Sequence, residues 1–199
     1  MKSTFLAVAL LCGASLAFGQ SFEGAVSGGP TILSSGSTIT PSLSSVPGAG
    51  DILKLDNGWN LGFRITVNPY RIFGYEFGYI YNRTHLLVGS TDIGGMAIHD
   101  GFADGLIYAT KEGSRIRPFG AAGLNFTNIV QPGASAQYSG QNKFGINYGA
   151  GIKVKVGSKW QLRFDIRQFN TSKPSFGLSG ISGRLLQTQI SAGFGFALY

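Results

Sequence analysis

Apolar and polar residues alternate along most of the chain from about residue 20 onward. In the segment 58–82, one set of alternate positions is aromatic or aliphatic, and most positions between them are small or polar. Successive side chains of a β-strand point to opposite faces, so this pattern predicts strands with one apolar and one polar face. The apolar set comprises Trp59, Leu61, Phe63, Ile65 and Val67, followed by Phe73, Tyr75, Phe77, Tyr79 and Tyr81.

The same alternation recurs between clusters of Gly, Pro, Asn or Ser along the rest of the chain. It predicts eight strands, near residues 21–33, 57–67, 72–82, 96–110, 116–129, 143–156, 160–169 and 185–198. Longer connections near 34–50, 83–95, 130–142 and 170–184 alternate with the tight turns "NPYR", "KEGSR" and "GSK". Outer-membrane barrels have short turns at one end and longer loops at the other, whereas a soluble sandwich has no reason to sort its connections in this way. The predicted fold class is therefore all-β, an eight-stranded antiparallel up-and-down transmembrane β-barrel over residues 20–199.

The charged residues indicate which face of each strand points to lipid. In the last strands before the closing one, they share the face opposite the apolar residues. A Lys or Arg facing lipid near the membrane midplane costs about 2–4 kcal/mol. We therefore expect the apolar faces to point outward and the charged faces to line the lumen, with Lys153, Lys155, Arg163, Asp165 and Arg167 inside.

The inward charges predict a polar network that fills the barrel. Pairing residues across "NPY" so that their numbers sum to 140 places Arg64 opposite Glu76 as a cross-strand ion pair. An eight-stranded barrel is just wide enough to be filled by its own side chains, and the glycines on this face leave room for long ones. The expected network comprises Arg64, Glu76, Lys153, Arg163, Asp165 and Arg167. We interpret it as a structural plug; the alternative is a gate whose ion pairs exchange partners, which would make the protein a narrow ion-passing pore.

The strand near 96–110 has a less regular pattern. Pairing across "KEGSR" places Ile107 opposite Phe119, which favours the odd residues facing lipid. Asp104 then points into the lumen as a possible counter-charge for the network. A bulge at Gly101 or Gly105 would reverse this phase locally.

The first 19 residues predict a secretory signal peptide. A Lys at position 2 precedes an apolar run, and small residues precede Gln20, so we expect cleavage before Gln20 or Ser21. The single Cys lies in this segment, so the exported chain has no disulfide or metal thiolate, and we expect no cofactor or metal.

The overall charge is +7, but the basic residues are scattered, which argues against nucleic-acid binding. Charged residues make up only 13% of the chain, against about 25% in soluble proteins, which is too few to solvate the outside of a soluble barrel.

The signal peptide, the alternating strands and the closing "LLQTQISAGFGFALY" together resemble the small outer-membrane β-barrels of the OmpA/OmpX type. The resemblance covers essentially the whole exported chain. It implies a monomer in the bacterial outer membrane, in contact with lipid and lipopolysaccharide, with a structural or surface-interaction role. It also implies that the barrel-assembly machinery reads the last strand, which ends at Tyr199, although the apolar series before it runs one residue out of phase.

Two other interpretations remain at this point. Some small outer-membrane barrels modify lipid A with a His, a Ser and an acidic residue at the outer rim. Here His85 lies near Ser90 and Asp92, and His99 precedes Asp100, but neither spacing specifies a catalytic triad, so we expect no enzyme activity. A soluble lipocalin-like barrel would instead turn the aromatic face inward.

Overall fold

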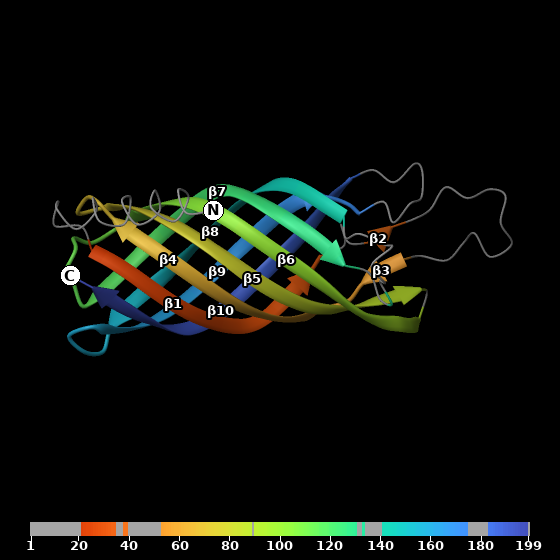
Figure 1. Cartoon of the computed structure of the whole chain (residues 1–199), viewed down its shortest axis with the longest axis horizontal. Coiled ribbons are helices and arrows are strands. Elements are labelled where there is room, and N and C mark those ends of the chain that lie inside the picture. The colour runs from red at the N-terminus through yellow and green to blue at the C-terminus, as the bar shows by residue number, and fades with distance from the viewer. Residues whose placement is uncertain are drawn as a thin grey trace, which may run out of the picture.

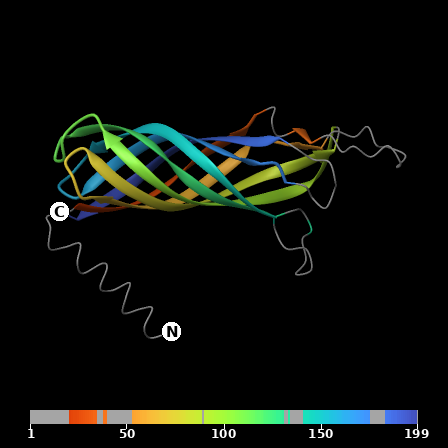
Figure 2. The same ribbon diagram turned by 90° about the horizontal axis from the view of Figure 1, so that it is seen from above.

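The computed structural model describes residues 21–34, 38–39, 53–88, 90–130, 133, 141–174 and 183–198. Eight long strands form a closed antiparallel barrel (Figures 1 and 2). They are β1 Ser21–Leu33, β4 Gly58–Asn68, β5 Phe73–Val88, β6 Thr91–Tyr108, β7 Ile116–Val130, β8 Gln141–Lys155, β9 Trp160–Ser172 and β10 Arg184–Leu198. Each pairs with the next around the ring, and the pairing of β1 with β10 closes it. The predicted fold class is confirmed.

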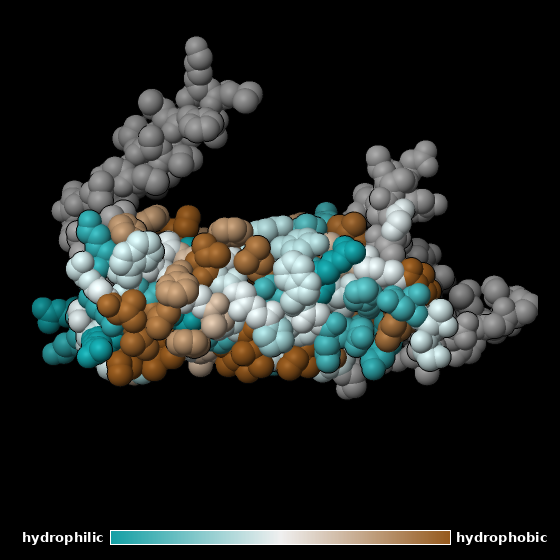
Figure 3. Space-filling view, turned by 90° about the horizontal axis from the view of Figure 1, so that it is seen from below, coloured by the Kyte–Doolittle hydropathy of each residue, from teal (hydrophilic) through white to brown (hydrophobic). Residues whose placement is uncertain are grey.

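The apolar faces of the strands point outward. Aromatic and aliphatic side chains on every wall of the barrel are exposed, among them Phe144 at 78%, Leu124 at 69% and Phe194 at 63%. Apolar side chains cover much of the barrel wall in Figure 3. The lipocalin-like alternative is therefore excluded, because it would bury these residues. No helix in the described part of the chain is long and apolar enough to cross a membrane.

The register across the first tight turn differs from the prediction by two residues. Val67 pairs with Tyr75, and Arg64 lies opposite Gly78 rather than Glu76, so the paired numbers sum to 142. β4 ends at Asn68 and β5 begins at Phe73, but the last residue pair before the turn is Val67 with Tyr75 rather than Val67 with Phe73. A shift of two residues leaves every side chain on its predicted face, because the period of a strand is two.

The second tight turn also pairs differently from the prediction. Ile107 lies opposite Gly120, whereas Phe119 lies opposite Tyr108 and points into the barrel. The predicted phase of this strand nevertheless holds, because Ile107 is exposed and Asp104 is buried. The bulge considered at Gly101 or Gly105 is absent from the β6–β7 pairing of the described residues; an irregularity lies instead at Leu86/Leu87 in β5.

The connection predicted as a loop at 83–95 is mostly strand. β5 continues to Val88 and β6 begins at Thr91, and the short strand β3 (Leu53–Leu55) pairs with the end of β5. Here the alternation inverts: Arg83 and His85 point outward, whereas Leu86 is buried inside. Polar residues outside and apolar residues inside are the pattern of a barrel wall surrounded by water rather than by lipid. The prediction failed because it sought apolar residues only on the outside.

Much of the other longer connections, the predicted signal peptide (residues 1–19) and Tyr199 lie outside the described residues. Within the connection near 34–50, the described part is the end of β1, Ser34 and the two-residue strand β2 (Thr38–Ile39), which pairs with β3.

Candidate functional site

The lumen of the barrel holds the residues of greatest chemical interest. In the described part of the chain, five basic and five acidic side chains are buried in it. Seven of them are the predicted Arg64, Glu76, Asp104, Lys153, Arg163, Asp165 and Arg167. Lys155, placed on the same face, is only half-buried, because it lies where β8 ends.

Glu76 is the centre of this network. Its carboxylate is fully buried and accepts two hydrogen bonds from Arg163, at 2.5 and 2.9 Å, and one from Arg167 at 2.7 Å. Thr66 donates a further bond at 2.9 Å. The predicted ion pair with Arg64 exists at 3.9 Å, but it is the longest of these contacts. Charge-assisted bonds of this kind, three from two guanidinium groups, fix the position of each group.

Two other carboxylates complete the neutralisation at this level. Asp165 accepts a bond from Arg163 at 2.8 Å and lies 3.2 Å from Arg64. Asp104 pairs with Arg167, as its predicted role as a counter-charge requires. Three guanidinium groups and three carboxylates thus meet in one layer, and their formal charges cancel.

Glycine makes room for this layer on β8. A Cβ atom at Gly149 would lie 2.7 Å from Cδ of Arg167 and 2.1 Å from the carbonyl oxygen of Ile166. A larger residue there would displace either the strand β9 or the guanidinium group. The glycines of the lumenal face were predicted to leave room for long side chains, and Gly149 does so for Arg167.

A second charged layer lies nearer the tight turns, and sequence reasoning missed most of it. Glu23 accepts bonds from Lys153 at 2.5 Å and from Gln161 at 2.8 Å, and it lies 3.8 Å from Arg117. Lys153 also donates to the hydroxyl of Tyr108 at 2.9 Å. The inward parity of Glu23 in its strand was the available signal; the weak pattern of that strand obscured it.

Asp100 forms a third polar layer on the other side of the centre. Its carboxylate accepts bonds from Asn82 at 2.9 Å, Gln187 at 2.8 Å, Gln189 at 3.1 Å and Thr127 at 2.5 Å. All four donors are neutral. Hydrogen bonding of this kind satisfies a buried carboxylate without a cationic partner.

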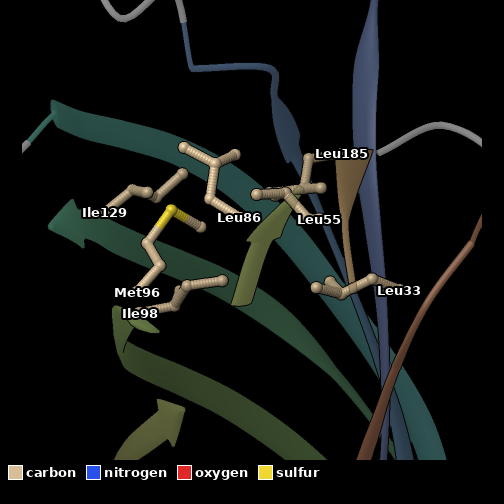
Figure 4. Close-up of a cluster of buried hydrophobic side chains, with 7 residues drawn as sticks. All are labelled: Leu33, Leu55, Leu86, Met96, Ile98, Ile129 and Leu185. Carbon is tan, nitrogen blue, oxygen red and sulfur yellow. The ribbon is translucent and has the colours of Figure 1, made fainter. Parts of the chain in front are cut away.

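An apolar cluster fills the lumen at the end opposite the tight turns. Its side chains come from six different strands and point toward one another (Figure 4). They are Leu33, Leu55, Leu86, Met96, Ile98, Ile129 and Leu185, each at most 8% exposed. From end to end, the described lumen is therefore occupied by two charged layers, the Asp100 layer and this apolar plug.

The two histidines lie outside the lumen. His85 Nδ1 lies 2.9 Å from Asp92 Oδ2, and both side chains are about half exposed. His99 Nδ1 lies 2.5 Å from the hydroxyl of Tyr79 on the outer wall. In the described residues, Ser90 forms no hydrogen bond with either imidazole, and no group of three or more His, Cys, Asp and Glu side chains is placed to hold a metal ion.

The closed ring, the apolar outer wall and the polar lumen are the features of a membrane β-barrel. The model of a family described as "Outer membrane protein beta-barrel domain" matches residues 3–197. The chain belongs to this family. Its members are proteins of the bacterial outer membrane, and this barrel is one of them. No curated protein matches the sequence.

Solved structures with the same fold agree with this assignment. The outer membrane protein OprG from Pseudomonas aeruginosa superposes with a TM-score of 0.62 at 14% identity, over 89% of this chain and 96% of that one. Neisserial surface protein A has a TM-score of 0.60 at 16% identity, over 89% and 98%. The N-terminal barrel of OprF from Pseudomonas aeruginosa has a TM-score of 0.52 at 16% identity, over 89% and 97%. At these identities the likeness concerns the fold.

Proposed function

We propose that this outer-membrane barrel is closed to ions and serves as a scaffold with a structural or surface-interaction role. The observation that carries the proposal is the filled lumen. An ion crossing it would have to separate the guanidinium groups of Arg163 and Arg167 from Glu76 and then pass the apolar plug. Work at the cell surface then falls to the outer segments, near 34–50, the end of the β5–β6 hairpin, 130–142 and 170–184.

Single-channel recording in planar bilayers tests this proposal. We expect the folded protein to give no stable conductance steps. The variant Leu86→Ala/Met96→Ala, in which the side chains of the apolar plug are smaller, should also stay closed because the charged layer remains. Conductance steps in the unmodified protein that disappear in Arg64→Ala or Glu76→Ala would contradict the scaffold proposal and favour a narrow ion-passing pore.

Catalysis is not part of the proposal. His85 bonds a carboxylate, but no serine hydroxyl lies within hydrogen-bond distance of it in the described residues, so a nucleophile and base are not assembled there. Modification of lipid A by the reconstituted protein, lost in His85→Ala or His99→Ala, would contradict this part.

Export and assembly complete the proposal. The chain would lose residues 1–19 on export and insert as a monomer among outer-membrane lipid and lipopolysaccharide, with the strand ending at Tyr199 presented to the barrel-assembly machinery. N-terminal sequencing of the protein from outer-membrane fractions tests the cleavage before Gln20 or Ser21.

A further inference from the structure

The three tight turns form a strongly basic end of the barrel. In residues 69–72, 109–115 and 156–159 and the strand end beside them, Glu112 is the one acidic residue. The basic residues, called here the basic rim, are Arg71, Lys111, Arg115, Lys155 and Lys159. Hydrophilic side chains lie toward both ends of the barrel in Figure 3, with apolar side chains between them. Short turns of outer-membrane barrels lie on the periplasmic side.

The basic rim lies where the apolar wall ends. Four of its members immediately precede an exposed apolar residue, namely Ile72 at 43%, Ile116 at 51%, Val156 at 55% and Trp160 at 55%. The ammonium group of Lys159 lies 5.9 Å from the ring centroid of Phe196, which itself contacts Trp160 on the outer wall. Tryptophan is enriched where hydrocarbon meets lipid headgroups. The basic rim is therefore at headgroup level.

Part of the basic rim converges on a cavity. Arg71, Lys111 and Lys155 line it together with Glu112 and Gly113, and its volume is about 380 Å³. A hydrogen bond of 3.4 Å from Arg117 to the carbonyl oxygen of Arg71 links the first turn to the barrel wall. Three basic groups against one carboxylate leave an excess of positive charge, which suits a phosphate group.

We propose that the basic rim binds the headgroup phosphates of anionic phospholipids in the periplasmic leaflet. The lipid chains cover the exposed apolar residues beside the rim, and the rim supplies the opposite charge at the depth of the phosphates. Each Lys or Arg near an anionic membrane surface strengthens the attraction about fivefold. The rim therefore selects anionic over zwitterionic lipid by charge.

The two tryptophans of the chain allow a direct test, because they lie at opposite ends of the apolar wall. Trp160 borders the basic rim, and Trp59 borders the outward-facing Arg83. In the Trp59→Phe protein, fluorescence then reports on lipid at the rim alone. The folded protein is reconstituted in two kinds of phosphatidylcholine bilayer. One contains a fixed fraction of phosphatidylglycerol with brominated chains, and the other contains the same fraction of phosphatidylcholine with brominated chains. Bromine quenches tryptophan on contact, so the ratio of the two quenching efficiencies measures the preference for anionic lipid.

We expect Trp160 to be quenched several-fold more effectively by brominated phosphatidylglycerol, and Arg71→Gln/Lys111→Gln/Lys159→Gln to remove this excess. A matched triple at the other end, Lys54→Gln/Arg83→Gln/Arg184→Gln, removes the same net charge and should leave the excess unchanged. Equal quenching by both lipids, or an excess that survives in the rim triple, overturns the proposal. Loss of the excess on adding millimolar inorganic phosphate in place of an equal ionic strength of chloride also overturns it, because the rim would then be a site for a soluble anion.

Discussion

Neutralising Glu76 tests whether the central layer holds the barrel together. In Glu76→Gln, the side chain keeps its shape but loses its charge, and one acceptor oxygen becomes an amide that faces guanidinium donors. The three bonds from Arg163 and Arg167 are charge-assisted, and each such bond contributes about 1.5–3 kcal/mol. These values do not add, because the same groups share them.

Breaking a buried ion pair by removing one partner costs about 3–5 kcal/mol, and Glu76 is fully buried. We expect the free energy of unfolding to fall by this amount. The measurement is a urea titration of protein folded into lipid vesicles, followed by tryptophan fluorescence. Glu112→Gln, in a turn and only half-buried, is the matched control and should change it by about 0.5 kcal/mol or less.

A double-mutant cycle separates the ion pair from other effects. The Arg163→Gln change removes two of the three charge-assisted donors to Glu76, so Glu76→Gln/Arg163→Gln should be less destabilised than the sum of the single variants by about 1–3 kcal/mol. A loss below about 1 kcal/mol in Glu76→Gln, or no coupling in the cycle, would refute the reasoning that this layer is a structural plug.

The register, the packing of the lumen and the closure of the ring give three further predictions. Ile65 and Phe77 are paired directly, so Ile65→Cys/Phe77→Cys should form a disulfide. Ile65→Cys/Tyr75→Cys should not, because diagonal positions are about 7–8 Å apart. A disulfide in the second variant would instead support the predicted register, in which paired residue numbers sum to 140. Gly149→Ala should lower the free energy of unfolding by about 1–3 kcal/mol, whereas Gly120→Ala, where an added Cβ meets nothing within 4 Å, should be neutral; equal effects would contradict the close approach of Arg167. On a denaturing gel, unheated protein from outer membranes should migrate faster than boiled protein, because the closed ring stays compact; a single band in both samples would argue against closure.

The sequence alone determined the number of long strands and their faces. Alternate positions along a strand face the same environment. Lipid, unlike water, excludes charged side chains, so the residue types at these positions show which face of the strand points to lipid. The inward direction of Arg64, Glu76, Asp104, Arg163 and Arg167 followed from parity alone, and it survived two errors of register.

Only the tertiary structure decided which of these residues meet. Each side chain points to the same face whether the paired residue numbers sum to 140 or to 142. The alternation therefore could not show that Arg64 lies opposite Gly78, which depends on the conformation of the turn 69–72. Glu76 and Arg163 lie 87 positions apart, and they meet because the ring closes and brings β5 across from β9. The same closure joins Glu23 to Lys153 and gathers the apolar plug from six strands. A local pattern records which environment a side chain faces, whereas the partner across a lumen depends on the size and stagger of the whole barrel.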